Sequence, residues 1–198
     1  MLLALDTTDG MCNVGVSREN SLLAFSEFSI HRGTSDIIFP QIEKTLMKAN
    51  ITLSQLSGFV VCTGPGNYTS LRIAISAIRG MALACGKPSV GVNLFDLLSE
   101  KKRPALVIIK GPADKVFIQK FSLEIVPEKP TVTDVAKVKK RQDLSNLSII
   151  GHEAKTIAKA VGGAHVVVTN EEKIRNLIEL GLVQINNNKQ RPSAVYIR

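Results

Sequence analysis

The chain has 198 residues, of which 44% are hydrophobic, and a net charge of +8, so it can bury a substantial core in one domain or two lobes. No apolar run approaches the roughly 20 residues that span a bilayer, and Asp6 interrupts the apolar start, so we expect a cytoplasmic protein without signal peptide or membrane anchor. Three widely spaced cysteines in apolar contexts indicate reduced core thiols rather than disulfides or a metal site.

The first half predicts a three-stranded meander that is followed by helix, strand, helix and strand. Apolar or alternating runs predict strands at residues 2–7, 13–17, 22–30, 59–62 and 89–92. Helical spacing predicts two helices, which we expect to begin at Ser35 or Asp36 and at Thr69 or Ser70. This order is typical of a ribonuclease-H-like lobe, which we place at residues 1–100.

The second half repeats only part of that order. Strands are predicted at residues 105–110, 116–121, 147–151, 165–169 and 194–197. Helices are predicted at 154–161 and 171–180, and a connection rich in proline and lysine runs through Pro127 and Pro130. We therefore expect a shortened second lobe at residues 101–198.

All of the net positive charge lies in this second half. Residues 1–98 carry seven basic and seven acidic side chains, whereas the remainder carries eighteen and ten. Basic clusters at 101–103 and 137–141 could attract an RNA backbone, but no aromatic residues are interleaved for base stacking. A weak contact with tRNA and a plain solvated surface both stay open.

A tight turn joins the strand at 59–62 to the next helix. The apolar run ends at Thr63, and the Gly64-Pro65-Gly66 sequence reverses the chain before the helix begins. Backbone N–H groups at such a helix start carry a partial positive charge that suits phosphate, although many such turns only close a crossover.

The segment GPGNYTSLRIAISAIRG, from Gly64 to Gly80, closely resembles the GPGSFTGLRIGLA-type signature of the TsaB (YeaZ) family. It departs from that signature at Asn67, Tyr68 and Ser70. Weaker similarity covers residues 2–8, 12–16, 86–92, 94–98 and 192–198. The resemblance implies an α/β protein of the actin-like ATPase fold, with two ribonuclease-H-like lobes of which the second is shortened.

The helix after the turn is apolar around most of its circumference. One apolar stripe can pack on the sheet, and a second, rich in alanine, would permit close approach of either the second lobe or another subunit. The resemblance favours a subunit, because TsaB proteins pair through the first two helices of this lobe with the catalytic subunit TsaD. The interface that it implies comprises Ile38, Ile42, Ile73, Ala74, Ala77, Gly80, Met81 and Ala84.

Local signatures of catalysis fail in this sequence. Pro88 replaces the Ser or Thr that a phosphate loop needs after Gly86-Lys87, and the pair His152-Glu153 lacks a second histidine four residues on. Neither these nor His31 and His165 stand at metal-ligand spacing, so we expect no metal on this chain.

The resemblance also draws attention to the end of the first strand. In actin-like ATPases an acidic residue there orients a magnesium-bound water, so Asp6, Thr7, Gly64 and Gly66 are candidate contacts for a nucleotide or phosphate. That chemistry requires a facing acid, but this chain has Lys110-Gly111 where relatives often read Asp-Ala-Arg. We therefore expect Asp6 to be structural rather than catalytic.

By resemblance to TsaB, we expect a non-catalytic scaffold in the synthesis of threonylcarbamoyladenosine, the modified adenosine beside the anticodon of tRNA. It would form a heterodimer with TsaD, which transfers the threonylcarbamoyl group, or a homodimer when alone, and would help to recruit the ATPase TsaE. ATP and metal would bind the partner subunits. The alternatives are an actin-like kinase or ATPase that uses Asp6, with magnesium-dependent nucleotide turnover, and a peptidase, against which the missing metal ligands argue.

Overall fold

The computed structural model describes residues 1–30, 33–123, 127–187, 191–195 and 197, and it divides the chain into two compact units. The first unit combines Met1–Leu97 with Asn170–Val195, and the second contains Leu98–Thr169. The division predicted at residue 100 thus differs at the C-terminal end, because residues 170–195 return to the first unit. The reason is the last helix, α6 (Asn170–Asn186), which contacts the strands of the first sheet.

The first unit is built on a five-stranded sheet in the order β3-β2-β1-β4-β5. Its strands are β1 (Leu2–Asp6), β2 (Met11–Arg18), β3 (Ser21–Ser29), β4 (Gly58–Cys62) and β5 (Ser89–Val92). The first three form an antiparallel meander, and β4 and β5 continue the sheet in parallel with β1. The ribonuclease-H-like order that the sequence predicts is therefore present.

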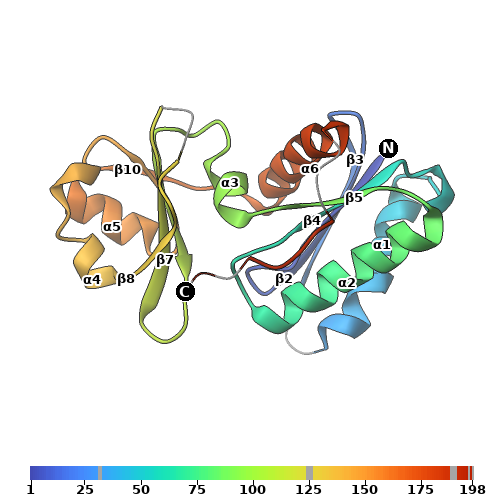
Figure 1. The fold of residues 1–198 in the computed structure, drawn as a ribbon, viewed down its shortest axis with the longest axis horizontal. Helices are drawn as coiled ribbons and strands as arrows, with labels where there is room; N and C mark the ends of the chain where they lie inside the picture. The colour runs from blue at the N-terminus through green and yellow to red at the C-terminus, as the bar shows by residue number, and fades with distance from the viewer. Residues whose placement is uncertain (31–32, 124–126, 188–190, 196, 198) are drawn as a thin grey trace. The chain divides into compact units, whose positions relative to one another are not determined.

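Helices cover both faces of this sheet (Figure 1). Leu3 and Leu5 of β1 share a hydrophobic cluster with α1 (Thr34–Lys48) and α2 (Tyr68–Cys85). Because side chains alternate along a strand, Asp6 points to the opposite face, which α6 covers. The approach of α6 is close, since a Cβ atom added at Gly15 would lie 2.2 Å from Ile174 Cγ2.

The second unit repeats this topology in its own five-stranded sheet. Its strand order is β8-β7-β6-β9-β10, so that the first strand of the unit, β6, again lies in the middle. Its strands are β6 (Ala105–Lys110), β7 (Lys115–Phe121), β8 (Thr131–Asp134), β9 (Ser148–Gly151) and β10 (Ala164–Val166). Strand β8 is absent from the predicted elements, because its residues are mostly polar and lie among prolines and lysines at the edge of the sheet. Its helices are short: α4 (Val135–Val138), α5 (Ala154–Val161) and the leading α3 (Leu94–Ser99), which starts in the first unit.

Several element ends differ from the predicted ones. Helix α1 begins after Gly33, which adopts a left-handed conformation at φ 69°, and α2 begins after Asn67, whose side chain accepts a hydrogen bond from the Ser70 N–H group. Single turns of 3₁₀ helix occur at Leu53–Gln55 and Gln142–Leu144. Residues 191–195 form no strand, contrary to the expectation for the chain end, and Tyr196 and Arg198 lie outside the described residues.

Within the described ranges, none of the helices is long and apolar enough to cross a membrane.

The contact of α6 with the sheet can be tested with two helical glycines. A Cβ atom at Gly181 would lie 2.5 Å from Val60 Cγ2, whereas a Cβ atom at Gly80 of α2 would meet nothing within 4 Å. We expect Gly181→Leu to lower the free energy of unfolding by about 1–3 kcal/mol through overpacking. Gly80→Leu is the control, and it is expected to gain up to about 1 kcal/mol of helix propensity. Urea unfolding measures both, and equal effects would contradict the packing of α6.

Candidate functional site

The candidate site lies at the carboxyl end of β1, on the face of the sheet that α6 covers. Asp6 is completely buried there. Its Oδ1 accepts two hydrogen bonds from Thr8, one from the backbone N–H group at 3.0 Å and one from the hydroxyl at 2.8 Å. One carboxylate oxygen is therefore used to hold the turn that follows the strand.

The other oxygen of Asp6 faces a lysine from the far end of the chain. Lys173 of α6 is only 5% exposed, and its Nζ lies 3.5 Å from Asp6 Oδ2 and donates a hydrogen bond to Asp9 Oδ2. Burial alone would lower the pKa of Lys173, but the two carboxylates more than offset it, so the pKa is raised and the amine stays protonated. The site is thus a buried ammonium held between two aspartates.

Sequence reasoning missed Lys173, although the helix pattern carries a signal. Lys173 lies four residues before Leu177 and eight before Gly181, on the buried side of α6. A lysine on the apolar side of an amphipathic helix indicates a buried counter-charge, but the sequence does not say which acid supplies it.

Other polar groups surround this ion pair. Asn13 of β2 stands directly opposite Asp6 in the β1–β2 register and is fully buried. Neither atom of its amide, nor the Thr7 hydroxyl, has a hydrogen-bond partner among the described residues. Burial, with a further contribution from the charge of Asp6, raises the pKa of the Cys62 thiol well above its usual value. The environment is enclosed and favours neutral groups, apart from the paired charges.

The Gly64-Pro65-Gly66 turn lies against Thr8, next to the end of β1. The four candidate phosphate contacts, Asp6, Thr7, Gly64 and Gly66, therefore lie in one region. Gly64 has a φ of 87°, and a Cβ atom at Gly66 would lie 2.6 Å from the carbonyl oxygen of Thr8. The Asn67 side chain caps the helix start by accepting the Ser70 N–H at 3.1 Å, and the Gly64 carbonyl accepts the Leu94 N–H at 2.6 Å. The Ser70 N–H, one of the donors that a phosphate at this helix start would use, is therefore already bonded within the chain.

The donor set offers little to a metal ion. Among the residues that the structure describes, no three His, Cys, Asp or Glu side chains gather closely enough to hold one. His31 lies outside the described residues. Lys110 ends β6 of the second unit at the position where Asp6 ends β1 of the first, so the two equivalent strands end in opposite charges.

The predicted partner interface on α1 and α2 needs a correction. Ile38, Ile42, Ala74 and Ala77 are buried in the core of the first unit, so they are not available to a partner. The small size of the alanines reflects close packing within this chain.

The remaining predicted interface residues stay closer to the surface. Ile73 and Met81 are half-buried against the core, whereas Gly80 and Ala84 are exposed.

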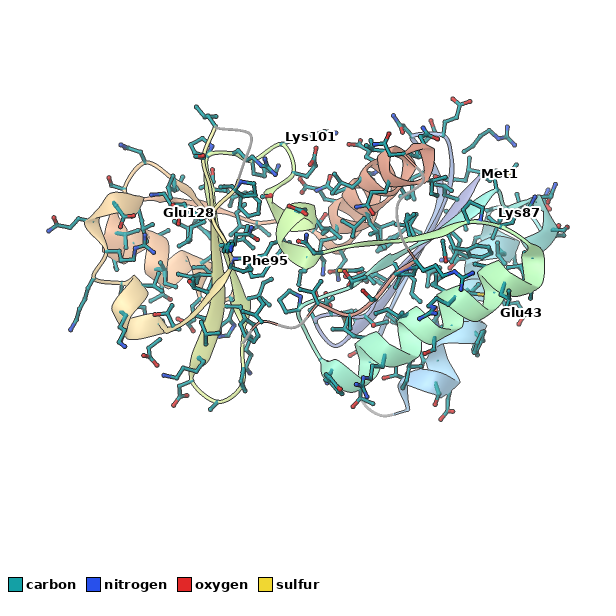
Figure 2. All side chains as sticks on the ribbon, in the orientation of Figure 1. Met1, Glu43, Lys87, Phe95, Lys101 and Glu128 are labelled. Atoms are coloured by element: carbon teal, nitrogen blue, oxygen red, sulfur yellow. The ribbon has the colours of Figure 1, made fainter. Side chains whose placement is uncertain are left out.

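Larger apolar side chains are exposed on the same two helices. Met47 of α1 is 73% exposed and Leu83 of α2 is 80% exposed, and Phe39 and Tyr68 are about half exposed. Glu43, labelled in Figure 2, lies on the exposed side of α1, four residues from both Phe39 and Met47. These residues are absent from the predicted interface, because the prediction rests on a small, alanine-rich face of α2.

Acidic partners surround the basic cluster at residues 137–141. Asp134 pairs with Lys115 at 2.6 Å and Lys137 at 3.4 Å, and Asp143 pairs with Arg141 at 2.6 Å. Hydrogen bonds from Lys115 and Arg141, respectively, lower the pKa of the two aspartates. Lys139 lies 3.8 Å from Glu153. These pairs reduce the charge that this surface can offer to RNA, and contact with tRNA stays a prediction.

The sequence is similar to those of proteins of tRNA threonylcarbamoyladenosine synthesis. Residues 29–190 match the family model for TsaD, tRNA N6-adenosine threonylcarbamoyltransferase. The chain is 30% identical over 123 residues to the tRNA threonylcarbamoyladenosine biosynthesis protein TsaB of Buchnera aphidicola subsp. Schizaphis graminum, covering 59% of this chain and 58% of that protein. Matches to the curated relatives span about half of their length.

Solved structures match the whole chain. A Pseudomonas aeruginosa protein described as similar to peptidase YEAZ has a TM-score of 0.77 at 19% identity, with 100% of this chain and 99% of that chain covered. The activator of 2-hydroxyisocaproyl-CoA dehydratase from Clostridium difficile, solved with bound ADPNP, has a TM-score of 0.56 at 8% identity, with 98% of both chains covered. These likenesses confirm the predicted α/β fold of the actin-like ATPase type.

Thiol alkylation tests whether the region around Asp6 is closed. Cys62 is fully buried with a raised pKa, and burial followed by the charge of Asp6 raises the pKa of Cys12 to about 12, whereas Cys85 is only half-buried. We expect iodoacetamide at about pH 8 to modify Cys85 first, and the other two only after unfolding, because the thiolate is the reactive form. Peptide mass spectrometry identifies the sites, with Cys85→Ser as the control that removes native-state labelling. Labelling of Cys62 as fast as Cys85 would show an open site.

Proposed function

This chain belongs to the TsaB (YeaZ) family, and on that premise we propose that it is a non-catalytic subunit in the synthesis of threonylcarbamoyladenosine in tRNA. It pairs with TsaD, which transfers the threonylcarbamoyl group to the adenosine beside the anticodon. In the absence of TsaD it forms a homodimer, and in the working system it helps to recruit TsaE. ATP and metal bind the partner subunits.

The observation that carries this proposal is the exposed apolar surface of α1 and α2. We name it the α1–α2 surface and define it by Phe39, Met47, Tyr68 and Leu83, which are each about half or more exposed. The two helices contact each other and share one hydrophobic cluster, and large exposed apolar side chains on neighbouring helices are typical of a contact site. Their burial against TsaD would supply roughly 25 cal/mol per Å² before the costs of association are subtracted.

The arrangement around Asp6 supports the non-catalytic part of the proposal. A catalytic carboxylate needs a free oxygen that can reach a proton or a metal-bound water. Oδ1 of Asp6 accepts two hydrogen bonds from Thr8, whereas Oδ2 accepts none from the described residues but lies 3.5 Å from the ammonium of Lys173, which neutralises its charge. Asp6 therefore stabilises the fold, and the chemistry belongs to TsaD.

A second candidate function, that of an actin-like kinase or ATPase, has one observation in its favour. Asp6, Thr7 and the Gly64–Gly66 turn lie together at the carboxyl end of the sheet, and a solved structure of similar fold contains ADPNP. This alternative predicts magnesium-dependent nucleotide hydrolysis by the purified chain. The paired state of Asp6 argues against it.

Arginine substitutions on the α1–α2 surface test pairing with TsaD. We expect Leu83→Arg and Met47→Arg to weaken association roughly tenfold or more, about 1.4 kcal/mol for each tenfold, because each places a charge in an apolar contact. The thermal stability of the isolated chain should stay unchanged, since both residues are exposed. Analytical ultracentrifugation or titration calorimetry with purified TsaD measures the effect.

Two further variants serve as controls for that experiment. Val183→Arg alters an exposed apolar residue on α6 and should leave pairing intact, whereas Ala77→Arg should unfold the chain because Ala77 is a core residue. Unchanged affinity in both Leu83→Arg and Met47→Arg would remove the α1–α2 surface from the interface.

A further inference from the structure

We propose that the ammonium group of Lys173 takes the place of a divalent cation at the carboxyl end of β1, where the resemblance to actin-like ATPases implies a magnesium-bound water, so that this site excludes the metal. The pairing of Lys173 with both Asp6 and Asp9 motivates this proposal. It concerns the isolated chain and does not depend on the proposed pairing with TsaD.

The residues at this position do not fit a magnesium ion. Mg²⁺ prefers about six oxygen ligands in octahedral geometry, of which one or two are usually carboxylates. Asp6 Oδ1 already accepts two hydrogen bonds from Thr8, and Oδ2, which accepts none from the described residues, lies 3.5 Å from the positive Nζ of Lys173. A metal ion at Oδ2 would meet this ammonium at short range, and like charges in an enclosed site repel strongly.

The lysine fits the same position well. Its ammonium group donates a hydrogen bond to Asp9 Oδ2, and its positive charge also attracts Asp6 Oδ2 at 3.5 Å. Lys173 contacts the buried Asp6 and the partly exposed Asp9, and its aliphatic stem lies in the buried face of α6. The positive charge that a bound metal would supply is therefore supplied by the chain itself.

Contacts elsewhere on α6 keep this ammonium in place. Asn176 Nδ2 donates a hydrogen bond to the Leu97 carbonyl oxygen at 3.1 Å, and Asn170 Nδ2 donates one to Glu27 Oε2 at the same distance. Ile174 packs directly against Gly15 and fills the space that a Cβ atom at position 15 would need. A metal ion that entered the site would have to displace the Lys173 ammonium from Asp6 and Asp9.

The charge pairing predicts strong coupling between Lys173 and Asp6. Lys173→Met keeps a long apolar stem but leaves Asp6 as a buried carboxylate without its cation, and removal of one partner of a buried pair is costly. We expect the ratio of folded to unfolded chain to fall roughly a hundredfold or more. The double variant Asp6→Asn with Lys173→Met removes both charges and should be clearly more stable than Lys173→Met alone.

Urea unfolding of the purified chain tests this coupling in a double-mutant cycle, with Asp6→Asn as the other single variant. The exposed pair of Lys115 and Asp134 is the matched control, and its cycle should show little coupling. If Lys173→Met fails to fold while the double variant folds, the proposal also stands. A double variant no more stable than Lys173→Met, or one that also fails to fold, would overturn it.

The thermal unfolding midpoint tests separately whether the site excludes a metal ion. We expect the midpoint of the wild-type chain to stay unchanged when MgCl₂ is added, alone or together with ADP, because a ligand that does not bind the native state cannot stabilise it. A rise in the wild-type midpoint that disappears in Asp6→Asn would show that the metal enters the site and would overturn the proposal. Both measurements use this chain alone, so failure of the TsaD pairing experiment leaves them unaffected.

Discussion

The ion pair between Lys173 and Asp6 joins the last helix of the chain to its first strand, and it constrains the first unit because neither charge can be buried without the other. Burying a charge is costly unless it is paired. Asp6 therefore needs Lys173 of α6 as its counter-charge, and Lys173 needs Asp6. Gly15 and Gly181 let the helix approach the sheet closely enough for this pair to form. Residues 170–195 therefore belong with residues 1–97, although the whole second unit lies between them in sequence.

Because Asp6 is paired with Lys173, the first unit can keep an actin-like fold without using this carboxylate for catalysis. The first unit keeps the strand order and the glycine turn of an actin-like fold, but its acidic residue holds a turn and a helix. The same unit exposes Met47 and Leu83 on the outer sides of α1 and α2. A fold whose central carboxylate is used for stability, and whose outer helices expose apolar side chains, suits a subunit that binds and positions an enzyme.

Local patterns in the sequence predict most of the elements, because strand alternation, helical spacing and glycine turns act over a few residues. They do not predict the partner of Lys173, since 164 residues separate it from Asp9 and only the folded topology brings them together. The strand β8 was missed because its edge position permits polar residues. Ala74 and Ala77 were assigned to an interface although they pack in the core, because a small residue serves close approach on either side of a helix.

Reconstitution of tRNA modification tests the central claim most directly. The chain is mixed with TsaD, TsaE, tRNA and a source of threonylcarbamoyl-adenylate, and modified adenosine is measured with and without it, alongside nucleotide hydrolysis by the chain alone. The account predicts that modification requires the chain while the isolated chain hydrolyses no ATP in the presence of magnesium. Modification that proceeds equally well without the chain, or magnesium-dependent hydrolysis that Asp6→Asn abolishes, would contradict it.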